Sequence, residues 1–329
     1  MSNIDHTPLI SVLTPSWDRA EFLPKLIKSL KNQTFKRFEW VIGNDGSTDH
    51  SHELLLSEFD ELDFNVTYIN SSLRIGKAKM DNLLIDHAEA EYLLWCDADD
   101  FFDTNALKNL YEATKEIPLL ERRNYVGVLG QNLDTFGISQ TFTKDNIPNN
   151  NQHFIWEELE KYIIGDGTIL IAKEHFAQKR FLEEDFLVQE SSILREIFKD
   201  KKFYFISDVI KIMDRTAENS ISFGKKLQYC RGSAIAIGVS INQDFFKELT
   251  IKNKLKTIVH YWRYSIHGDF SYLDAKKLWP VSNAYFAISF FYPISLLICI
   301  RDKLLNKVEK THLEFYKNVE KTDIKITKF

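Results

Sequence analysis

The chain has 329 residues, of which 44% are hydrophobic and 27% are charged, so it can bury the core of one large domain or two smaller ones. Its formal net charge of −5 lacks the basic excess that is typical of nucleic-acid-binding proteins, so we expect no nucleic-acid partner. Three cysteines lie far apart and match neither a metal-ligand spacing nor a disulfide framework, which favours a reducing compartment (Cys96, Cys230, Cys299).

The first 130 residues alternate segments typical of strands with segments typical of helices. Strands are expected at Leu9–Pro15, in Phe38–Ser47 before a turn, at Asn65–Asn70 and at Tyr92–Cys96. Helices are expected at Arg19–Asn32, from about Asp49, and at Gly76–Glu89. In the second helix, the inner face is expected to carry Leu54, Leu55, Leu56 and Phe59. The alternation predicts an α/β fold with a Rossmann-like, mainly parallel sheet flanked by helices.

Three of the predicted strands end in polar residues. These are Thr14, Ser16 and Asp18 after the first strand, Asn44 and Asp45 after the second, and Asp97, Asp99 and Asp100 after the fourth. Ligands of such sheets bind outside the carboxyl ends of the strands. We therefore expect these side chains to line one ligand crevice.

The densest of these polar groups is the acidic cluster in YLLWCDADD, Tyr92–Asp100. Carboxylates this close repel one another, so either water screens them at a loop tip or they hold a cation. In an extended segment, Asp97 and Asp99 would point to the same side, where Mg²⁺ or Mn²⁺ could bind carboxylate oxygens and still accept phosphate. The alternative is a solvated turn, or the cap of a helix that begins near Thr104.

Two common nucleotide-binding motifs are missing from the sequence. The first strand is followed by TPSWDRAE and not by G-x-G-x-x-G, which argues against a nicotinamide- or flavin-binding domain. There is also no G-x-x-x-x-G-K-[ST], which excludes a P-loop kinase.

Five stretches together resemble a family 2 glycosyltransferase of the GT-A fold. They are ISVLTPSWDR (Ile10–Arg19), FEWVIGNDGSTD (Phe38–Asp49), RIGKAKMDN (Arg74–Asn82), YLLWCDADD, and the region around FLVQESSILREI (Phe186–Ile197). The resemblance covers about the first 220 residues. Two positions depart from the family pattern, because Asn44 replaces a usual aspartate and Asp18 replaces a frequent asparagine.

This resemblance implies a metal-dependent, inverting transferase with a nucleotide-diphospho-sugar donor. Asp99 would be the direct ligand of Mn²⁺ or Mg²⁺, with Asp97 as a second ligand or nearer the ribose, and Asp100 would orient the sugar. The bound ion would act as a Lewis acid on the departing diphosphate.

The resemblance also implies how the nucleotide is held. Asp45 would accept a hydrogen bond from the N3–H of uracil, while Thr14 and Pro15 would line the base pocket by backbone and packing. Lys77 and Arg74 could contact phosphate, or they could be solvated charges at the start of a helix.

The second half of the chain must supply the base that deprotonates the acceptor hydroxyl. Apolar spacing predicts a helix that begins near Glu190 or Ser191, and a carboxylate at a helix start is kept ionised by the helix dipole. A branch of the resembling family has a glutamate just before this helix. We therefore expect Glu190 to be the base, with Asp185 as the second candidate.

The predicted domains are a catalytic domain at 1–222, with a nucleotide-sugar half at 1–130 and an acceptor half at 131–222, and a helical C-terminal region at 223–329. Within that region, 278–300 has no charged residue, and the tail 301–329 has a net charge of +3. A peripheral helix on an anionic membrane is one interpretation, and a buried helical hairpin of the fold is the other. The N-terminus shows no secretory signal, so the expected location is the cytoplasmic face of the plasma membrane.

The leading hypothesis is thus a glycosyltransferase that acts on a glycan or lipid-linked acceptor in bacterial surface polysaccharide synthesis. A nucleotidyltransferase also uses a doubly wound domain and paired acids, but it would normally show a loop rich in glycine and lysine near the N-terminus. A catalytically silent sugar-binding module at a membrane is the third hypothesis, and the acids at 97–100 and Glu190 weigh against it.

Overall fold

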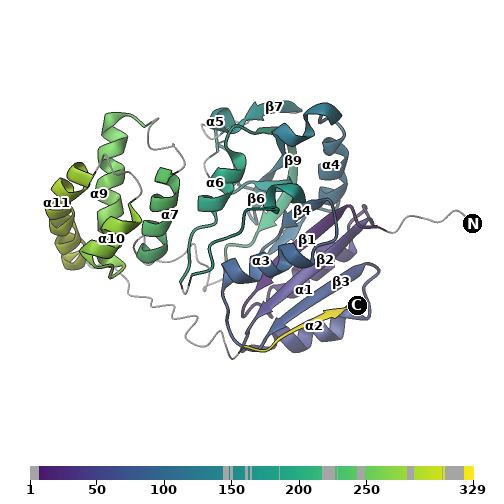
Figure 1. Cartoon of the computed structure of the whole chain (residues 1–329). Coiled ribbons are helices and arrows are strands. Elements are labelled where there is room, and N and C mark those ends of the chain that lie inside the picture. Colours follow the sequence, from purple (N-terminus) through teal and green to yellow (C-terminus); the bar gives the residue numbers. More distant parts are fainter. Residues whose placement is uncertain are drawn as a thin grey trace, which may run out of the picture. The chain divides into compact units, whose positions relative to one another are not determined.

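The computed structural model describes residues 7–143, 148, 151–159, 162–163, 165–184, 186–216, 227, 229–242, 249–279, 285–305, 307 and 322–329. The chain forms two compact units, and Figure 1 traces both along the sequence. The sheet unit comprises Met1–Arg180, Ile197–Ala217 and Asn318–Phe329. The helical unit comprises Phe181–Glu196 and Glu218–Lys317.

The sheet unit is built on one mixed sheet with the strand order β10-β3-β2-β1-β4-β8-β6-β9-β5, and β7 pairs with β9. The strands are β1 (Ile10–Ser16), β2 (Phe38–Asp45), β3 (Asn65–Ser71), β4 (Tyr92–Trp95), β5 (Asp100–Phe102), β6 (Tyr125–Asp134), β7 (Gln152–Ile155), β8 (Thr168–Ala172), β9 (Lys202–Met213) and β10 (Ile324–Lys328). The four strands β3-β2-β1-β4 are parallel, so their carboxyl ends meet at one edge. The predicted α/β class is confirmed.

The segments between these strands contain the predicted helices α1 (Leu23–Lys31), α2 (Ser51–Phe59), α3 (Lys77–His87), α4 (Ala106–Thr114) and α6 (Ser191–Phe198). They also contain α5 (Trp156–Leu159) and the 3₁₀ helices η1 (Leu119–Asn124) and η3 (Lys173–Phe176), which are not among the predicted helices. Helix α1 begins with Pro24 in its first turn, a position that needs no backbone N–H, and it buries Leu23, Leu26, Ile27 and Leu30. This spacing of three and four residues places one apolar face on the sheet.

Helix α2 corrects one expectation. Leu55 and Phe59 are buried, but Leu56 is exposed. Successive helical residues are rotated by about 100°, so three consecutive leucines cannot all face the sheet.

The helical unit contains α7 (Cys230–Asn242), α9 (Ile251–His267), α10 (Tyr272–Leu278) and α11 (Tyr285–Leu304) (Figure 1). The side chains of Thr250 and Ser271 cap α9 and α10 by accepting from backbone N–H groups. Trp262 lies at the centre of the aromatic core, with its ring parallel to that of Tyr272 at 5.3 Å. The predicted C-terminal helices are therefore confirmed over the described residues.

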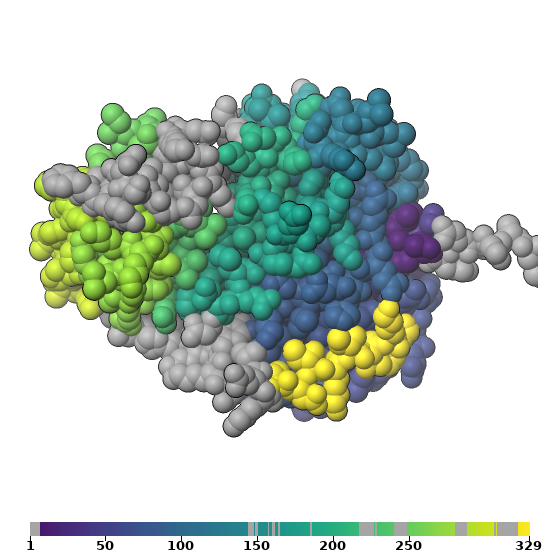
Figure 2. All heavy atoms as spheres, in the orientation of Figure 1, coloured from purple at the N-terminus to yellow at the C-terminus, as the bar shows by residue number. Residues whose placement is uncertain are grey.

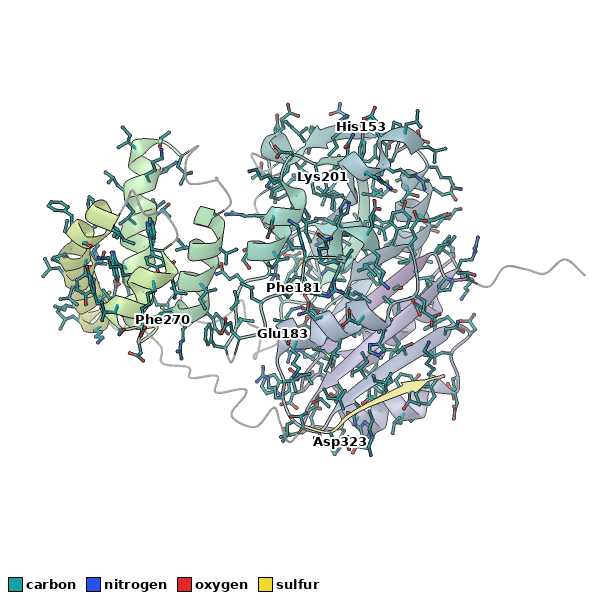
Figure 3. All side chains as sticks on the ribbon, viewed as in Figure 1. His153, Phe181, Glu183, Lys201, Phe270 and Asp323 are labelled. Carbon is teal, nitrogen blue, oxygen red and sulfur yellow. The ribbon has the colours of Figure 1, made fainter. Side chains whose placement is uncertain are left out.

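The end of the chain, within the region 223–329 that is predicted as helical, is a strand. Strand β10 pairs antiparallel with β3, and the ring of Phe329 lies 4.7 Å from that of Phe59. Asp323, labelled in Figure 3, precedes the strand and accepts the Ser72 N–H at its carbonyl (3.0 Å). Figure 2 shows this strand in yellow on the surface of the sheet unit. It covers an edge of β3 that would otherwise present unpaired backbone groups.

The apolar segment 278–300 lies partly outside the described residues, and its described part is α10's last residue, Trp279 and most of α11. Among the helices that the structure describes, none is both long enough and apolar enough to cross a membrane.

Candidate active site

The loops that follow β1 and β2 are joined by hydrogen bonds. Asp18 has a left-handed backbone (φ 49°), and its Oδ1 accepts from the N–H groups of Thr48 (2.7 Å) and Asp49 (3.3 Å). In return, Ser47 Oγ accepts the Asp18 N–H, and Asp49 Oδ2 accepts the Ala20 N–H, both at 2.9 Å. By accepting these hydrogen bonds, the Asp18 carboxylate holds the two loops together.

The acidic segment after β4 is a turn. The N–H of Asp100 donates to the carbonyl of Asp97 at 3.0 Å, so the chain reverses between β4 and β5. The expectation that Asp97 and Asp99 alternate along an extended segment is therefore wrong. The turn still gathers three carboxylates at the carboxyl end of β4, as predicted from the strand order.

Each carboxylate of this acidic turn, defined as Asp97–Asp100, contacts a different cation. Lys77 Nζ lies 3.4 Å from Asp97, and Arg19 Nε lies 3.3 Å from Asp99. Beneath them, Lys211 Nζ lies 2.8 Å from Asp100. The opposite charges relieve the repulsion that three neighbouring carboxylates would otherwise experience.

The pair of Asp100 and Lys211 is almost completely buried. Burial raises the pKa of the Asp100 carboxyl to about 6, although Lys211 acts to lower it. Burial also lowers the pKa of Lys211, but the charges of Asp100 and Asp97 outweigh this effect and raise it. Both groups are therefore ionised at neutral pH and stabilise each other.

The two outer carboxylates differ in how readily they ionise. Burial acts to raise the pKa of Asp97, but Lys77 and Lys211 overcome it, and the net pKa is lowered. Burial and the charge of Asp97 raise the pKa of Asp99, with Arg19 acting in the opposite direction. The negative charge of the turn is thus held most firmly at Asp97.

Lys77 stands between two carboxylates. Besides Asp97, it donates to Asp81 one helical turn later (3.2 Å), and the buried Asp81 also accepts from Trp95 Nε1 (3.0 Å). This network fixes the first turn of α3 beside the acidic turn. The contact of Lys77 with phosphate stays a prediction. Its ammonium group lies next to the acidic turn, where the diphosphate is predicted to bind.

Asp45, at the end of β2, is also buried. Its carboxylate accepts from the N–H groups of Ile75 (2.5 Å) and Gly76 (2.9 Å), which precede α3. Gly76 has φ of 90°, a conformation that favours glycine. Burial raises the pKa of Asp45 to about 6, although both N–H groups and Arg74 lower it.

The predicted base pocket has one more element, Trp17. The guanidinium carbon of Arg74 lies 3.2 Å from the centre of the Trp17 ring and covers one face of it, which ties Trp17 to the loop held by Asp45. Thr14 is fully buried, and its hydroxyl accepts from Trp40 Nε1 (3.0 Å). The side chain of Thr14 thus belongs to the core, while Pro15 lies half-buried beside it in β1.

Of the two candidate bases, the structure describes only Glu190. Glu190 immediately precedes α6, and its carbonyl accepts from the N–H groups of Ile193 and Leu194, both at 3.1 Å. This confirms the predicted helix start. Asp185 lies outside the described residues.

Sequence reasoning missed Arg19, Lys211, Asp81 and Trp17. Arg19 and Trp17 lie within the first quoted motif, so their proximity to the site was a usable signal. Lys211 lies in VIKIMD, a charged residue within an apolar strand, which is the pattern of a buried partner for another charge.

Comparisons with known proteins bear on the family and the fold. The sequence model described as Glycosyl transferase family 2 matches residues 11–178, slightly more than half of the chain. A relative from Campylobacter jejuni, GalNAc(5)-diNAcBac-PP-undecaprenol beta-1,3-glucosyltransferase, is 26% identical over 219 residues, which cover 66% of this chain and 68% of the relative.

Solved structures show the same fold. Residues 1–349 of Staphylococcus aureus TarS, in complex with UDP-GlcNAc, match with a TM-score of 0.54 at 14% identity, covering 91% of this chain and 92% of that one. The mannosyltransferase PcManGT from Pyrobaculum calidifontis, in complex with GDP-Man and Mn²⁺, matches with a TM-score of 0.50 and covers 91% of this chain and 81% of that one. Another crystal structure of S. aureus TarS contains a longer chain, of which this chain covers 54%, with a TM-score of 0.52.

The buried pair can be tested by changing Lys211 to Met. This change leaves Asp100 buried without its cation and should reduce the free energy of unfolding at neutral pH by about 3 kcal/mol. Because Lys211 lowers the pKa of Asp100, its removal should raise that pKa above about 6, so the deficit should shrink as the pH falls toward about 6 and stay constant below it. Urea denaturation of the purified protein measures both effects.

Two further variants make the Lys211 test specific. Lys115→Met removes an exposed lysine that pairs with Glu112 and lies 5.5 Å from the centre of the Tyr111 ring, and it should change stability by less than about 0.5 kcal/mol. The double variant Asp100→Leu/Lys211→Met should recover much of the loss, because no charge remains buried alone. A double variant as unstable as the single one would contradict the electrostatic explanation.

Proposed function

The chain belongs to glycosyl transferase family 2, and from this premise we propose that it transfers a sugar from a nucleotide-diphospho-sugar, with UDP as the nucleotide. The transfer proceeds with inversion to a hydroxyl of a glycan or lipid-linked glycan in surface polysaccharide synthesis. The acidic turn beside Asp45 and Trp17 carries the proposal, because it joins a charged site for a diphosphate to a flat, polar site for a base.

The acidic turn fits a divalent cation that binds together with the donor. Among the described residues, no group of three or more His, Cys, Asp or Glu side chains could hold a metal ion. Asp97 and Asp99 nevertheless supply hard oxygen ligands, and Mg²⁺ often takes one or two carboxylates and completes its coordination with substrate phosphates. Mn²⁺ or Mg²⁺ bound there would supply Lewis-acid stabilisation of the leaving diphosphate.

The cations around the turn have a second role in this proposal. Arg19 and Lys77 contact Asp99 and Asp97, and these contacts support a role for both cations in binding the diphosphate. On donor binding, their N–H groups donate to phosphate oxygens and hold the leaving group in place. Lys211 keeps its contact with the buried Asp100 and stabilises the turn from beneath.

The base-recognition site uses Asp45, which accepts from the N3–H of uracil, and Trp17, whose ring stacks on the base. Asp100 orients the donor sugar. Glu190 removes the proton from the acceptor hydroxyl as the hydroxyl oxygen attacks the anomeric carbon and the diphosphate leaves. The enzyme works at the inner face of the plasma membrane, where lipid-linked acceptors are exposed.

The proposal is tested first by hydrolysis of UDP-sugars, measured as UDP release, with and without Mn²⁺. Activity should need the metal, and Asp99→Ala should reduce it at least about 100-fold, because a ligand of the Lewis acid is lost. Asp60→Ala, at an exposed acid beyond α2, is the matched control and should keep full activity. Indifference of the wild type to both Mn²⁺ and UDP-sugars would refute the proposed function.

The proposed role of Asp45 gives a pH dependence. Only the ionised carboxylate accepts from N3–H, so UDP-sugar affinity should fall about tenfold per pH unit as the pH drops below about 6. A UDP-sugar is the right probe, because the terminal phosphate of UDP itself titrates near this pH. Titration calorimetry should show the full fall in the wild type and a shallower one in Asp45→Asn, where Asp100 still titrates near pH 6; equal profiles would exclude Asp45 from base recognition.

The assignment of the base predicts that Glu190→Gln reduces kcat about 100-fold and leaves the KM for the donor almost unchanged. Glu196→Gln changes the same residue type on the same helix and should retain activity. Asp185→Asn is the competing variant. If it lost activity while Glu190→Gln remained active, Asp185 would be the base and the Glu190 assignment would be wrong.

A further inference from the structure

Helix α11 has its polar residues inside. Ser295 and Asp302 are both 0% exposed. Cys299, which is also buried, lies between them on the same face. Ser295 Oγ donates to the carbonyl of Phe291 (3.0 Å), and Asp302 Oδ2 accepts from Arg263 Nε of α9 (2.5 Å). Spacings of four and three residues place these side chains on the face that packs against α9.

The opposite face of α11 is apolar and exposed to solvent. Phe290 is 63% exposed, Leu297 is 68% exposed and Leu304 is 81% exposed. These residues are seven apart and lie on one line of the helix, with Ile294 and Ile300 beside them. This exposed stripe, residues 290–304, is about 21 Å long at 1.5 Å per residue.

The helix cannot hide this stripe by rotating about its axis. Rotation would pull Asp302 away from Arg263 and from the buried His267, whose Nε2 lies 3.4 Å from Asp302 Oδ2. It would also leave charged groups in the aromatic core of the helical unit, which is strongly unfavourable. The polar contacts therefore fix which face points outward.

The charged residues of α9, α10 and α11 are mostly positive. These helices contain eight Lys or Arg and only two Asp or Glu, in a chain whose net charge is −5, and one of the eight, Arg263, pairs with the buried Asp302. On α11 the one acid, Asp302, is buried, whereas Arg301 and Lys303 are exposed. An apolar stripe with cations beside it complements an anionic lipid surface.

We propose that the exposed stripe of α11 binds an anionic bilayer, with the helix lying in the plane of the interface. A second copy of the chain fits less well, because a symmetric pair would place the same positive surfaces against each other. The inference depends on α11 and its neighbours and is independent of the sugar-transfer proposal. Lipid binding and donor hydrolysis can therefore fail separately.

The test is flotation of the full chain with two kinds of vesicle, phosphatidylcholine alone and phosphatidylcholine mixed with phosphatidylglycerol. We expect binding to the mixed vesicles that weakens as salt increases. Phe290→Ser and Leu297→Gln should each reduce the partition coefficient about tenfold, because each removes one inserted apolar side chain. Both residues are exposed, so neither change should lower the thermal unfolding temperature.

The matched controls are Phe136→Ser and Leu120→Gln, which change even more exposed apolar residues of the sheet unit and should bind as the wild type does. UDP-sugar hydrolysis should be unchanged in all four variants. Binding to mixed vesicles that is equal in wild type and in Leu297→Gln would overturn the proposal. So would a stable dimer in analytical ultracentrifugation that Leu297→Gln dissociates, since a second copy would then cover the stripe.

Discussion

The sheet unit depends on the balance of charge at the acidic turn. Three carboxylates lie within four residues, and each is held by a cation from a different part of the chain: Arg19 after β1, Lys77 at the start of α3, and Lys211 in β9. Without these cations, repulsion among the three carboxylates would destabilise the turn. The same contacts tie together segments that are almost 200 residues apart in the sequence, so the site and the fold share one set of interactions.

This balance also explains why a divalent ion is chemically reasonable there. Asp81 adds a fourth carboxylate through Lys77, so four acids share three cations before any ligand binds. A nucleotide-sugar brings about two further negative charges in its diphosphate. Lysine and arginine alone would then leave an excess of negative charge in a partly buried site, which is costly. A divalent cation that arrives with the donor offsets most of that excess.

Sequence patterns predict the parts of the fold that depend on local residues. They do not predict the contacts that form between residues far apart in the sequence. Apolar runs followed by polar residues located β1, β2 and β4 and the edge where their ends meet. The pattern at Asp97–Asp100 predicts an extended segment, because the hydrogen bond that closes the observed turn has no residue signature of its own. Lys211 lies 111 positions after Asp100, and β10 pairs with a strand more than 250 positions earlier, so no local periodicity reveals either contact.

Composition alone left two interpretations of the segment 278–300, a membrane-associated helix and a buried hairpin. The structure of α11 contains part of each, because one face is buried against α9 and the other is exposed and apolar. Polar atoms decide the orientation, since Asp302 must stay with Arg263 and His267 whatever covers the outer face. A helix selected only for solubility would place its serine and aspartate outside and its leucines inside. The reverse arrangement indicates that the outer face has an apolar partner, and the surrounding lysines and arginines indicate that this partner is negatively charged.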